Sequence, residues 1–373
     1  MDAYLVGAVR SPIGRRGGSL SAVHPADLAG QVIVSLLERS GADPDVVDDV
    51  ILGCVDTLGP QSGDIARTAW LAAGLPEHVP GVTVDRQCGS GQQAVHFAAQ
   101  AVASGSADLV VAGGVQSMSR VPIGSAMGEE GPYRGSAGWV LRYGSQEVDQ
   151  FRSADDIAAK WSLHRSELEE YALESHRRAV AAIDSGVLKA EISGIGVDEC
   201  PRRDTDRVRM AALAPLRDGG VTTAATSSQL ADGAAALLVA SSLAVRRYGL
   251  RPRARIKHLS VRGDDPVLML TAPIAATAHA LSRADLKISD ISRFEVNEAF
   301  ASVALAWLRE TAADPERTNI NGGALAHGHP LGATGAKLLV SMVHELERCE
   351  GRYGLVTMCE GGGQANATII ERC

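Results

Sequence analysis

Two stretches of this chain follow the same design, and that repeat limits the folds open to it more than any other feature. In the first half, a glycine- and serine-rich turn after Cys88 opens a helix of small residues and leads to the strand LVVAGG. In the second half, HPLGATGAKLLVSMVHELERC leads to GLVTMCEGGG in the same order. Such self-similarity indicates a duplicated architecture. We therefore expect two copies of a βαβ-containing unit, packed together with the two helices buried between them.

Small residues dominate both helices, and this predicts where a site would form. The chain has 40 glycines and only 4% aromatic residues. Without bulky side chains the two helices can approach closely, and their N-termini would point at a shared space. We therefore expect the site at the junction of the two halves.

The rest of the chain supports an α/β fold. Short β-branched runs such as AYLVGAV and DDVILGCV alternate with helical patterns such as ADLAGQVIVSLLERSG, which is typical of a largely parallel sheet. After residue 119 the chain becomes rich in Gly, Ser and Pro, and two amphipathic helices follow, the second with Ser166 as its expected cap. The predicted organisation is a first half, an inserted loop domain, the last strand region of the first half and a second half: 1–119, 120–228, 229–250 and 251–373.

Composition excludes several classes of function. The net charge of −8 argues against a nucleic-acid partner, and an anionic ligand would need a local basic patch. The N-terminus does not have the pattern of a signal peptide, and no run of about 18–20 apolar residues predicts a membrane span. The six cysteines show no CxxC spacing, so we expect them to be reduced. A cytoplasmic enzyme is the expected class.

Cys88 is the first candidate for chemistry. It stands where a valine-rich strand ends and a helix begins, and the partial positive charge of a helix N-terminus is expected to lower the pKa of a thiol. Gly89 and Gly91 leave room for a substrate and free backbone amides to donate hydrogen bonds. A structural thiol packed against small residues is the alternative.

His329 and Cys359 occupy matching positions in the second half. His329 precedes Pro330 on a rigid glycine-rich turn, as a positioned base requires. His327 is expected to belong to the pocket wall or to support His329. Cys359 ends a buried strand ahead of three glycines and could exchange a proton at the same site. Cys54 is expected in the core, and the remaining cysteines are incidental.

Asn297 and Glu298 end another predicted strand. Polar side chains at such a place are costly if they are buried without partners. We expect Asn297 to donate a hydrogen bond in the site and Glu298 to organise the histidine. Helix capping by Asn297 is the alternative.

These segments together resemble the thiolases, the family of acetyl-CoA acetyltransferases and 3-ketoacyl-CoA thiolases. The matching motifs are RSPIG, DRQCGSGQQA, GGVQSMS, SSQLADGAA, NEAFA, NGGALAHGHPLGATGA and CEGGG, which together span essentially the whole chain. CEGGGQAN is similar to the degradative thiolases of actinobacteria. The resemblance implies duplicated βαβαβαββ halves that form a five-layered α-β-α-β-α core, with a loop domain inserted.

The resemblance also implies an activity. Thiolases cleave a 3-ketoacyl-CoA with free CoA, and the reverse reaction is a Claisen condensation. On this chain Cys88 would carry the acyl group, His329 would take its proton, and Cys359 would serve as acid or base. One oxyanion hole would use His329 and a water held by Asn297, and the other the amides of Cys88 and Gly361. Coenzyme A would be a co-substrate, with no permanently bound cofactor.

Contacts to the acyl-CoA follow from the same resemblance. The inserted domain would cover the CoA, Ser228 would touch the pantetheine arm, and Arg202 in RRDTDRVR would offer charge to the phosphates. The other implied contacts are Phe300, His327 and Phe151, and a homodimer or homotetramer is expected. This sequence departs from the family pattern at Gln116, Ala225, Thr226 and Gln150–Phe151.

The leading hypothesis is a degradative enzyme in β-oxidation of a fatty acid or a steroid side chain. A biosynthetic acetoacetyl-CoA thiolase uses the same groups, so the sequence leaves the direction open. A non-catalytic thiolase-fold protein that binds lipid or CoA is a further alternative. A metal site built from His327, His329 and Cys359 lacks a convincing fourth ligand.

Overall fold

Two sets of strands with the same order account for the repeat in the sequence. In the computed structural model, which describes residues 2–128, 131–194 and 196–373, the first half has the order β4-β3-β5-β6-β1 and the second β8-β9-β10-β7. In each half the last strand along the chain, β6 or β10, runs antiparallel to its neighbours. The strand bounds are β1 Ala3–Arg10, β2 Gly14–Arg15, β3 Asp49–Gly53, β4 Gly81–Val84, β5 Leu109–Ser117, β6 Ala231–Ser241, β7 Ala254–Gly263, β8 Ile291–Val296, β9 Tyr353–Glu360 and β10 Gln364–Arg372.

The two halves differ at their outer edges. In the first half β4 is the outermost strand, and its Val82 is exposed. The matching position in the second half is reduced to a single parallel bridge between Phe294 and Thr318. Beyond it, Asn319 hydrogen-bonds the backbone of β8. Its backbone N donates to Phe294 O, its Nδ2 donates to Val296 O, and its Oδ1 accepts from Val296 N. At the centre of the molecule β1 pairs with β7 over only two residue pairs, which joins the halves.

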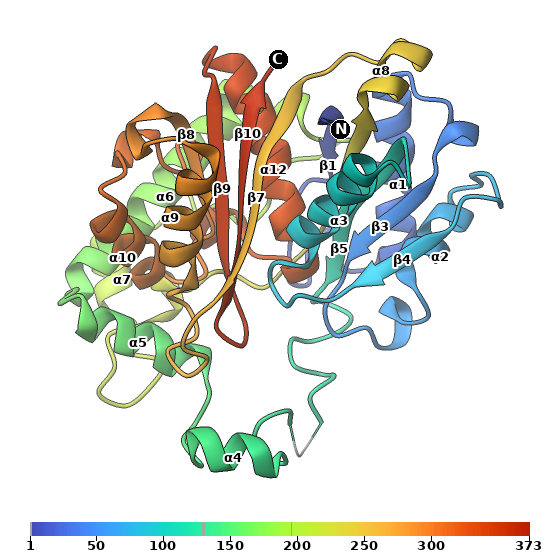
Figure 1. Cartoon of the computed structure of the whole chain (residues 1–373). Coiled ribbons are helices and arrows are strands. Elements are labelled where there is room, and N and C mark those ends of the chain that lie inside the picture. Colours follow the sequence, from blue (N-terminus) through green and yellow to red (C-terminus); the bar gives the residue numbers. More distant parts are fainter. Residues whose placement is uncertain (1, 129–130, 195) are drawn as a thin grey trace.

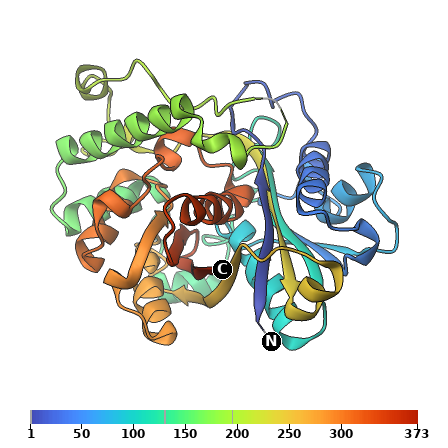
Figure 2. The same ribbon diagram turned by 90° about the horizontal axis from the view of Figure 1, so that it is seen from above.

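Five layers result, and they confirm the predicted α/β architecture. Helices α1 (Pro25–Ser40) and α2 (Ile65–Ala72) cover the outer face of the first half, and α9 (Ala272–Ala284) and α10 (Ala301–Thr311) cover that of the second (Figure 1). Helices α3 (Ser90–Ser104) and α12 (Leu331–Arg348) lie between the halves, as the view from above shows (Figure 2).

The central helices meet through glycine. A Cβ added to Gly91 would lie 2.6 Å from the carbonyl oxygen of Gly332, and one added to Gly335 would lie 2.6 Å from the amide nitrogen of Gln92. Atoms that close overlap, so larger side chains would force the two helices apart. The predicted close approach of the two helices is therefore confirmed.

The segment between β5 and β6 carries α4 (Ala137–Tyr143), α5 (Gln150–Lys160), α6 (Arg165–Ser185) and α7 (Arg207–Ala211). Helices α5 and α6 pack against α10, whereas α4 projects from the body and leaves Leu141 90% exposed (Figure 1). Ser166 was predicted to cap α6, but the N-cap is His164. The Glu167 carboxylate accepts a hydrogen bond from the His164 amide at 3.1 Å. The proposed domain boundaries remain a prediction.

Two short helices complete the set, α8 (Ser242–Tyr248) and α11 (Ala324–His327). Among the described residues, no helix combines the length and the apolar character that a membrane crossing demands.

Candidate active site

Cys88 lies where the sequence predicted, directly before the N-cap of α3. Gln87, the residue before it, has a φ of 49°, a left-handed backbone conformation that is uncommon for a side chain of this size. The tight turn that results presents the partly exposed Cys88 side chain beside Val55, Met118 and Leu331. Backbone strain of this kind is frequent at functional sites.

The electrostatics of Cys88 differ from the expectation. The thiol pKa is raised to about 12, chiefly because burial disfavours the thiolate and next because of the charge of Glu360. The backbone amides of Cys88 and Gly361 act in the opposite direction but do not prevail. The prediction that the helix N-terminus lowers this pKa is therefore wrong for the free chain. Cys88 is a thiol at neutral pH and needs a base.

His329 has the protonation state and the tautomer of such a base. Burial lowers its pKa to about 4, so the ring is neutral at pH 7. Its Nδ1 lies 2.7 Å from Thr334 Oγ1, and that hydroxyl donates its only proton to the carbonyl oxygen of Pro330 at 3.0 Å. Thr334 must therefore accept from Nδ1–H, which leaves the lone pair of His329 on Nε2.

This arrangement makes Thr334 a testable partner of His329. Thr334→Val removes the acceptor for Nδ1–H, so the competing tautomer becomes populated and kcat is expected to fall about 10- to 100-fold with little change in KM. Steady-state rates over pH 6–9 with a 3-ketoacyl-CoA, the substrate that the resemblance implies, measure this. Thr277→Val is the matched control, because Thr277 is an equally buried threonine that accepts a ring N–H bond from Trp307 at 2.9 Å, in α9. A wild-type kcat in the Thr334 variant would contradict the assignment.

Asn297 and Glu298 follow β8 and turn in different directions. Asn297 Nδ2 lies 3.4 Å from His329 Nε2, and its Oδ1 is buried without a partner among the described residues. Helix α10 begins at Ala301 with Phe300 as N-cap, so Asn297 does not cap it. The Glu298 carboxylate accepts from Ser175, Leu325 N and two further donors, so it anchors the loop before α11 and does not touch His329.

Cys359 and Gly361 come from the end of β9. Cys359 is 1% exposed and packs in an apolar cluster with Phe300, whose ring meets Phe151 edge-on at 5.7 Å. Burial, followed by the charges of Cys88 and Glu360, raises the Cys359 pKa well above its usual value. The structure thus brings Cys88, Cys359 and Gly361 together, and Asn297 joins His329 at the opening of α12.

His327 is directed elsewhere. Its Nε2 lies 2.8 Å from Asn321 O, and its Nδ1 is at ion-pair distance, 3.0 Å, from Asp198 Oδ2 but without hydrogen-bond alignment. Asp198 in turn holds the buried Arg10 through both carboxylate oxygens. Both ring nitrogens of His327 therefore face protein groups, and the network fixes the segment that carries His329.

Of the predicted CoA contacts, Arg202 lines a separate cavity and Ser228 lies beside the cluster that contains Cys359 and Phe300. Arg202, Arg209, Ala225 and Gln229 are among the residues that line a cavity of about 220 Å³. Ser228 donates its amide to Ala299 O, and a bridge between Ser227 and Phe300 sets this strip beside the apolar cluster.

Two of the departures from the family pattern, Gln116 and Thr226, make hydrogen bonds that account for them. Gln116 is buried; its Oε1 accepts from Val55 N and Gly332 N, and its Nε2 donates to Val55 O. A glutamate could make the first two bonds but not the third, because an ionised carboxylate cannot donate. Thr226 bonds both ways with the backbone of Thr223, and Ala225 lines the cavity.

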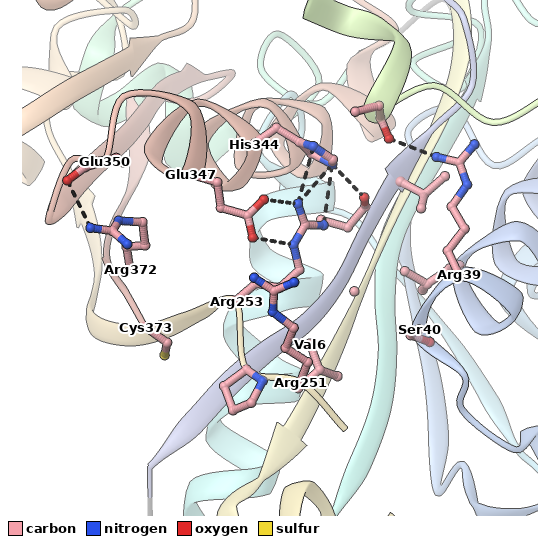
Figure 3. Close-up of a pocket in the computed structure, with 16 residues that line it drawn as sticks. Val6, Arg39, Ser40, Arg251, Arg253, His344, Glu347, Glu350, Arg372 and Cys373 are labelled. Atoms are coloured by element: carbon pink, nitrogen blue, oxygen red, sulfur yellow. Dashed lines mark hydrogen bonds and ion pairs between the residues drawn. The ribbon is translucent and has the colours of Figure 1, made fainter. Parts of the chain in front are cut away.

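A larger cavity of about 690 Å³ lies at the other end of the strands (Figure 3). Arg253 pairs with Glu347, and Arg372 donates to the carbonyl oxygen of Glu350 (Figure 3). Arg372 also donates to the carbonyl oxygen of Gly351, after α12. Cations at a helix C-terminus stabilise its exposed carbonyls. These arginines are thus engaged within the protein, and the cavity is remote from Cys88.

Sequence reasoning missed two residues of this site, Thr334 and Glu360. Thr334 stands in the first turn of α12, where a hydroxyl can reach back to the preceding loop. Glu360 was visible as a charge between a buried strand and three glycines, but no role was assigned to it.

Comparisons with known proteins agree with this geometry. Residues 3–242 match the family described as "Thiolase, N-terminal domain", and residues 250–372 match "Thiolase, C-terminal domain". The chain is 57% identical to a steroid 3-ketoacyl-CoA thiolase of Mycobacterium tuberculosis, over 100% of this chain and 94% of that protein. It is 42% identical to a beta-ketoadipyl-CoA thiolase of Pseudomonas aeruginosa, over 100% and 99%.

A solved structure shows the same likeness. The crystal structure of the Bacillus anthracis acetyl-CoA acetyltransferase matches with a TM-score of 0.91 at 37% identity, over 100% of this chain and 99% of that chain. The chain therefore belongs to the thiolase family, as an acyltransferase of the class that contains the 3-ketoacyl-CoA thiolases and acetyl-CoA acetyltransferases.

Proposed function

We propose that the chain cleaves 3-ketoacyl-CoA through an acyl-Cys88 intermediate. His329 Nε2 takes the thiol proton, and the Cys88 sulfur attacks the 3-keto carbon. The bond between C2 and C3 then breaks, its electron pair stays on C2, and the Cys359 thiol protonates that carbon to give acetyl-CoA. The thiol of a second CoA returns a proton to Cys359, its sulfur takes the acyl group, and the imidazolium of His329 returns the proton to Cys88.

Oxygen atoms gain negative charge in these steps and need donors. The amides of Cys88 and Gly361 are proposed to stabilise the oxygen of the group bound to Cys88. A water held by Asn297, together with His329, is proposed to stabilise the thioester oxygen at the C2 side. The unpaired Oδ1 of buried Asn297 supports this, because it leaves a site for a donor. The observation that carries the proposal is the convergence of Cys88, Cys359 and the Gly361 amide.

The proposed substrate class is an apolar, bulky 3-ketoacyl group, as in degradation of a steroid side chain or a fatty acid. Cys359 lies among Phe300, Met269 and Leu270, with Phe151 at the border. The arginines beside this cluster are already paired: Arg152 with Asp156 at 3.3 Å and Arg217 with Glu147 at 2.9 Å. An acyl chain that ends in a carboxylate would therefore enter an apolar space without a counter-ion. The similarity to a steroid thiolase adds to this.

A matched pair of substrates tests the class. 3-Oxohexanoyl-CoA and 3-oxoadipyl-CoA have the same chain length and differ by the terminal carboxylate, so kcat/KM is expected to be at least about tenfold lower for the second. A steroid-derived 3-ketoacyl-CoA and acetoacetyl-CoA complete the panel. Equal rates for the pair would overturn the apolar class, and a clear preference for acetoacetyl-CoA would favour a biosynthetic short-chain enzyme. Absence of any cleavage would overturn thiolysis itself.

Ligand contacts and assembly form part of the same proposal. Arg202, which lines the 220 Å³ cavity, is proposed to bind the phosphates of CoA. Ser228, which lies outside the lining of that cavity, is proposed to contact the pantetheine arm. The open edge of β4 is proposed to pair with a second copy in a homodimer or homotetramer.

The chemistry needs free thiols at Cys88 and Cys359, and all six cysteines, which lie in the described residues, are free. A reducing compartment, the cytoplasm, is therefore proposed.

A further inference from the structure

Glu360 is a carboxylate in an unusual place, next to both cysteines. It is the last residue of β9 and is 0% exposed. Because side chains alternate along a strand, it points to the opposite face from Cys359. That face meets the start of α3: a Cβ added to Gly89 would overlap Glu360 Oε1. Glu360 therefore packs against the backbone of the residue that follows Cys88.

In the described part of the chain, neither oxygen of the carboxylate has a partner of full hydrogen-bond geometry, although the backbone amide of Asn366 is near enough to favour its charged form; one nitrogen of a nearby arginine is also unpaired. Both oxygens of Glu360 and the Nε of Arg86 are buried without a hydrogen bond among the described residues. Arg86 uses another of its nitrogens to reach Gln364 Oε1 at 2.9 Å. Buried polar atoms are rarely left unpaired, and those that are often have a functional reason.

Few other charges face this carboxyl group. The loop before α3 supplies Asp85, Arg86 and the Cys88 thiol, and β9 supplies Cys359 on its other face. The first turn of α12 carries no charged residue. Behind the turn between β9 and β10, Asp264 accepts from Thr271 and Asp265 from backbone amides. The charges that act on a Cys88 thiolate are thus those of Glu360 and, to a smaller extent, Asp85.

We propose that Glu360 is a positioning residue that links the ionisation of Cys88 to its own, so that the two groups do not carry negative charge together. The inference rests on the proposed role of Cys88 as the nucleophile. Two like charges in a buried space cost more than one, and the group that ionises first holds back the other. Cys88 is therefore activated while Glu360 keeps its proton and is restrained once Glu360 is charged.

The link predicts the shape of a pH profile. Burial raises the Glu360 pKa to about 8, with Arg86 and the backbone amide of Asn366 acting in the opposite direction. Below pH 8 Glu360 is neutral, so the Cys88 thiolate fraction should rise tenfold per pH unit. Above pH 8 the charge of Glu360 raises the Cys88 pKa, so the rise should slow until the thiol itself ionises. Without the carboxylate the tenfold slope should continue through pH 8.

Alkylation of Cys88 by iodoacetamide reads the thiolate directly. Rates between pH 6.5 and 10 are measured for the whole chain, with Cys88 modification quantified by peptide mass spectrometry. Glu360→Gln keeps the shape of the side chain without its charge. The two proteins should react equally at pH 6.5, and the variant should react about tenfold faster near pH 9.5. Glu360→Ile, which also removes the hydrogen-bonding atoms, should behave like Glu360→Gln.

Glu295→Gln is the matched control. Glu295 is also a buried strand-end carboxyl with an unpaired oxygen and a pKa raised to about 8 by burial, but its charged neighbours are Lys337 and other glutamates. Its variant should keep the wild-type profile. Equal profiles for wild type and Glu360→Gln would overturn the proposal, as would a change of the same size in Glu295→Gln. If Cys88 is not the nucleophile, a separate experiment shows it: incubation with acetyl-CoA would leave no acyl group on Cys88.

Discussion

Replacing Cys88 with alanine is expected to abolish thiolysis, with kcat reduced roughly 10⁴-fold or more. Alanine has no atom that can carry the acyl group. The amides of residues 88 and 361 and the base His329 stay in place, so only the covalent route is lost. Any residual turnover would come from binding and from the oxyanion donors alone.

Incubation with acetyl-CoA followed by peptide mass spectrometry measures the intermediate. The wild type should gain one acetyl group on the peptide that contains Cys88, and Cys88→Ala should gain none. Cys349→Ala is the control, because that half-buried thiol lies at the end of α12 and should keep full activity and labelling. Acetylation of a different cysteine, or thiolysis that persists in Cys88→Ala, would refute the covalent mechanism.

Replacing Cys359 with alanine is expected to have the second large effect, and it separates carbon–carbon bond cleavage from acyl transfer. In Cys359→Ala, cleavage of 3-ketoacyl-CoA is expected to fall about 10³-fold, because no group remains to deliver a proton to C2. The raised pKa of Cys359 keeps it a thiol at neutral pH, so the proton is in place when the carbon–carbon bond breaks. Transfer of an acetyl group from acetyl-CoA to Cys88 needs no proton at C2, and His329 can pass the proton between Cys88 and the CoA sulfur, so this transfer should persist.

Two assays on the same variant distinguish these roles. Thiolysis is followed by loss of the 3-ketoacyl-CoA absorbance, and acyl transfer by exchange of labelled CoA into acetyl-CoA. Retained exchange with lost thiolysis is the expected result. If both reactions fell together, Cys359 would be acting on the Cys88 step or on the stability of the site, and the assignment would be wrong.

Much of the fold could be predicted because it is encoded in local patterns. Buried strands such as β5 and β6 are continuous apolar runs, and the glycines of α3 and α12 mark helices that touch. The candidate residues Cys88, His329 and Cys359 could be predicted too, since each stands in a glycine-rich motif that has a counterpart in the other half or in a known family.

Other features depend on distances that a sequence does not contain. The direction of the Cys88 pKa shift is a balance between burial, two amides and the charge of Glu360, and the burial is the largest part. Thr334 matters only because its hydroxyl reaches His329 across five residues. His327 was expected at the pocket wall or in support of His329, and the sequence does not show that its ring contacts Asp198, more than a hundred residues earlier in the chain.

The unequal edges of the two halves limit how such molecules can polymerise. A duplicated fold with an open strand at both ends could add copies end to end and grow into a filament. Here Asn319 hydrogen-bonds the β8 backbone at Phe294 and Val296, whereas β4, at the other end of the sheet, has no strand on its outer side among the described residues. If two copies pair edge to edge through β4, as proposed above, both β4 edges are covered, and further growth would need a different surface.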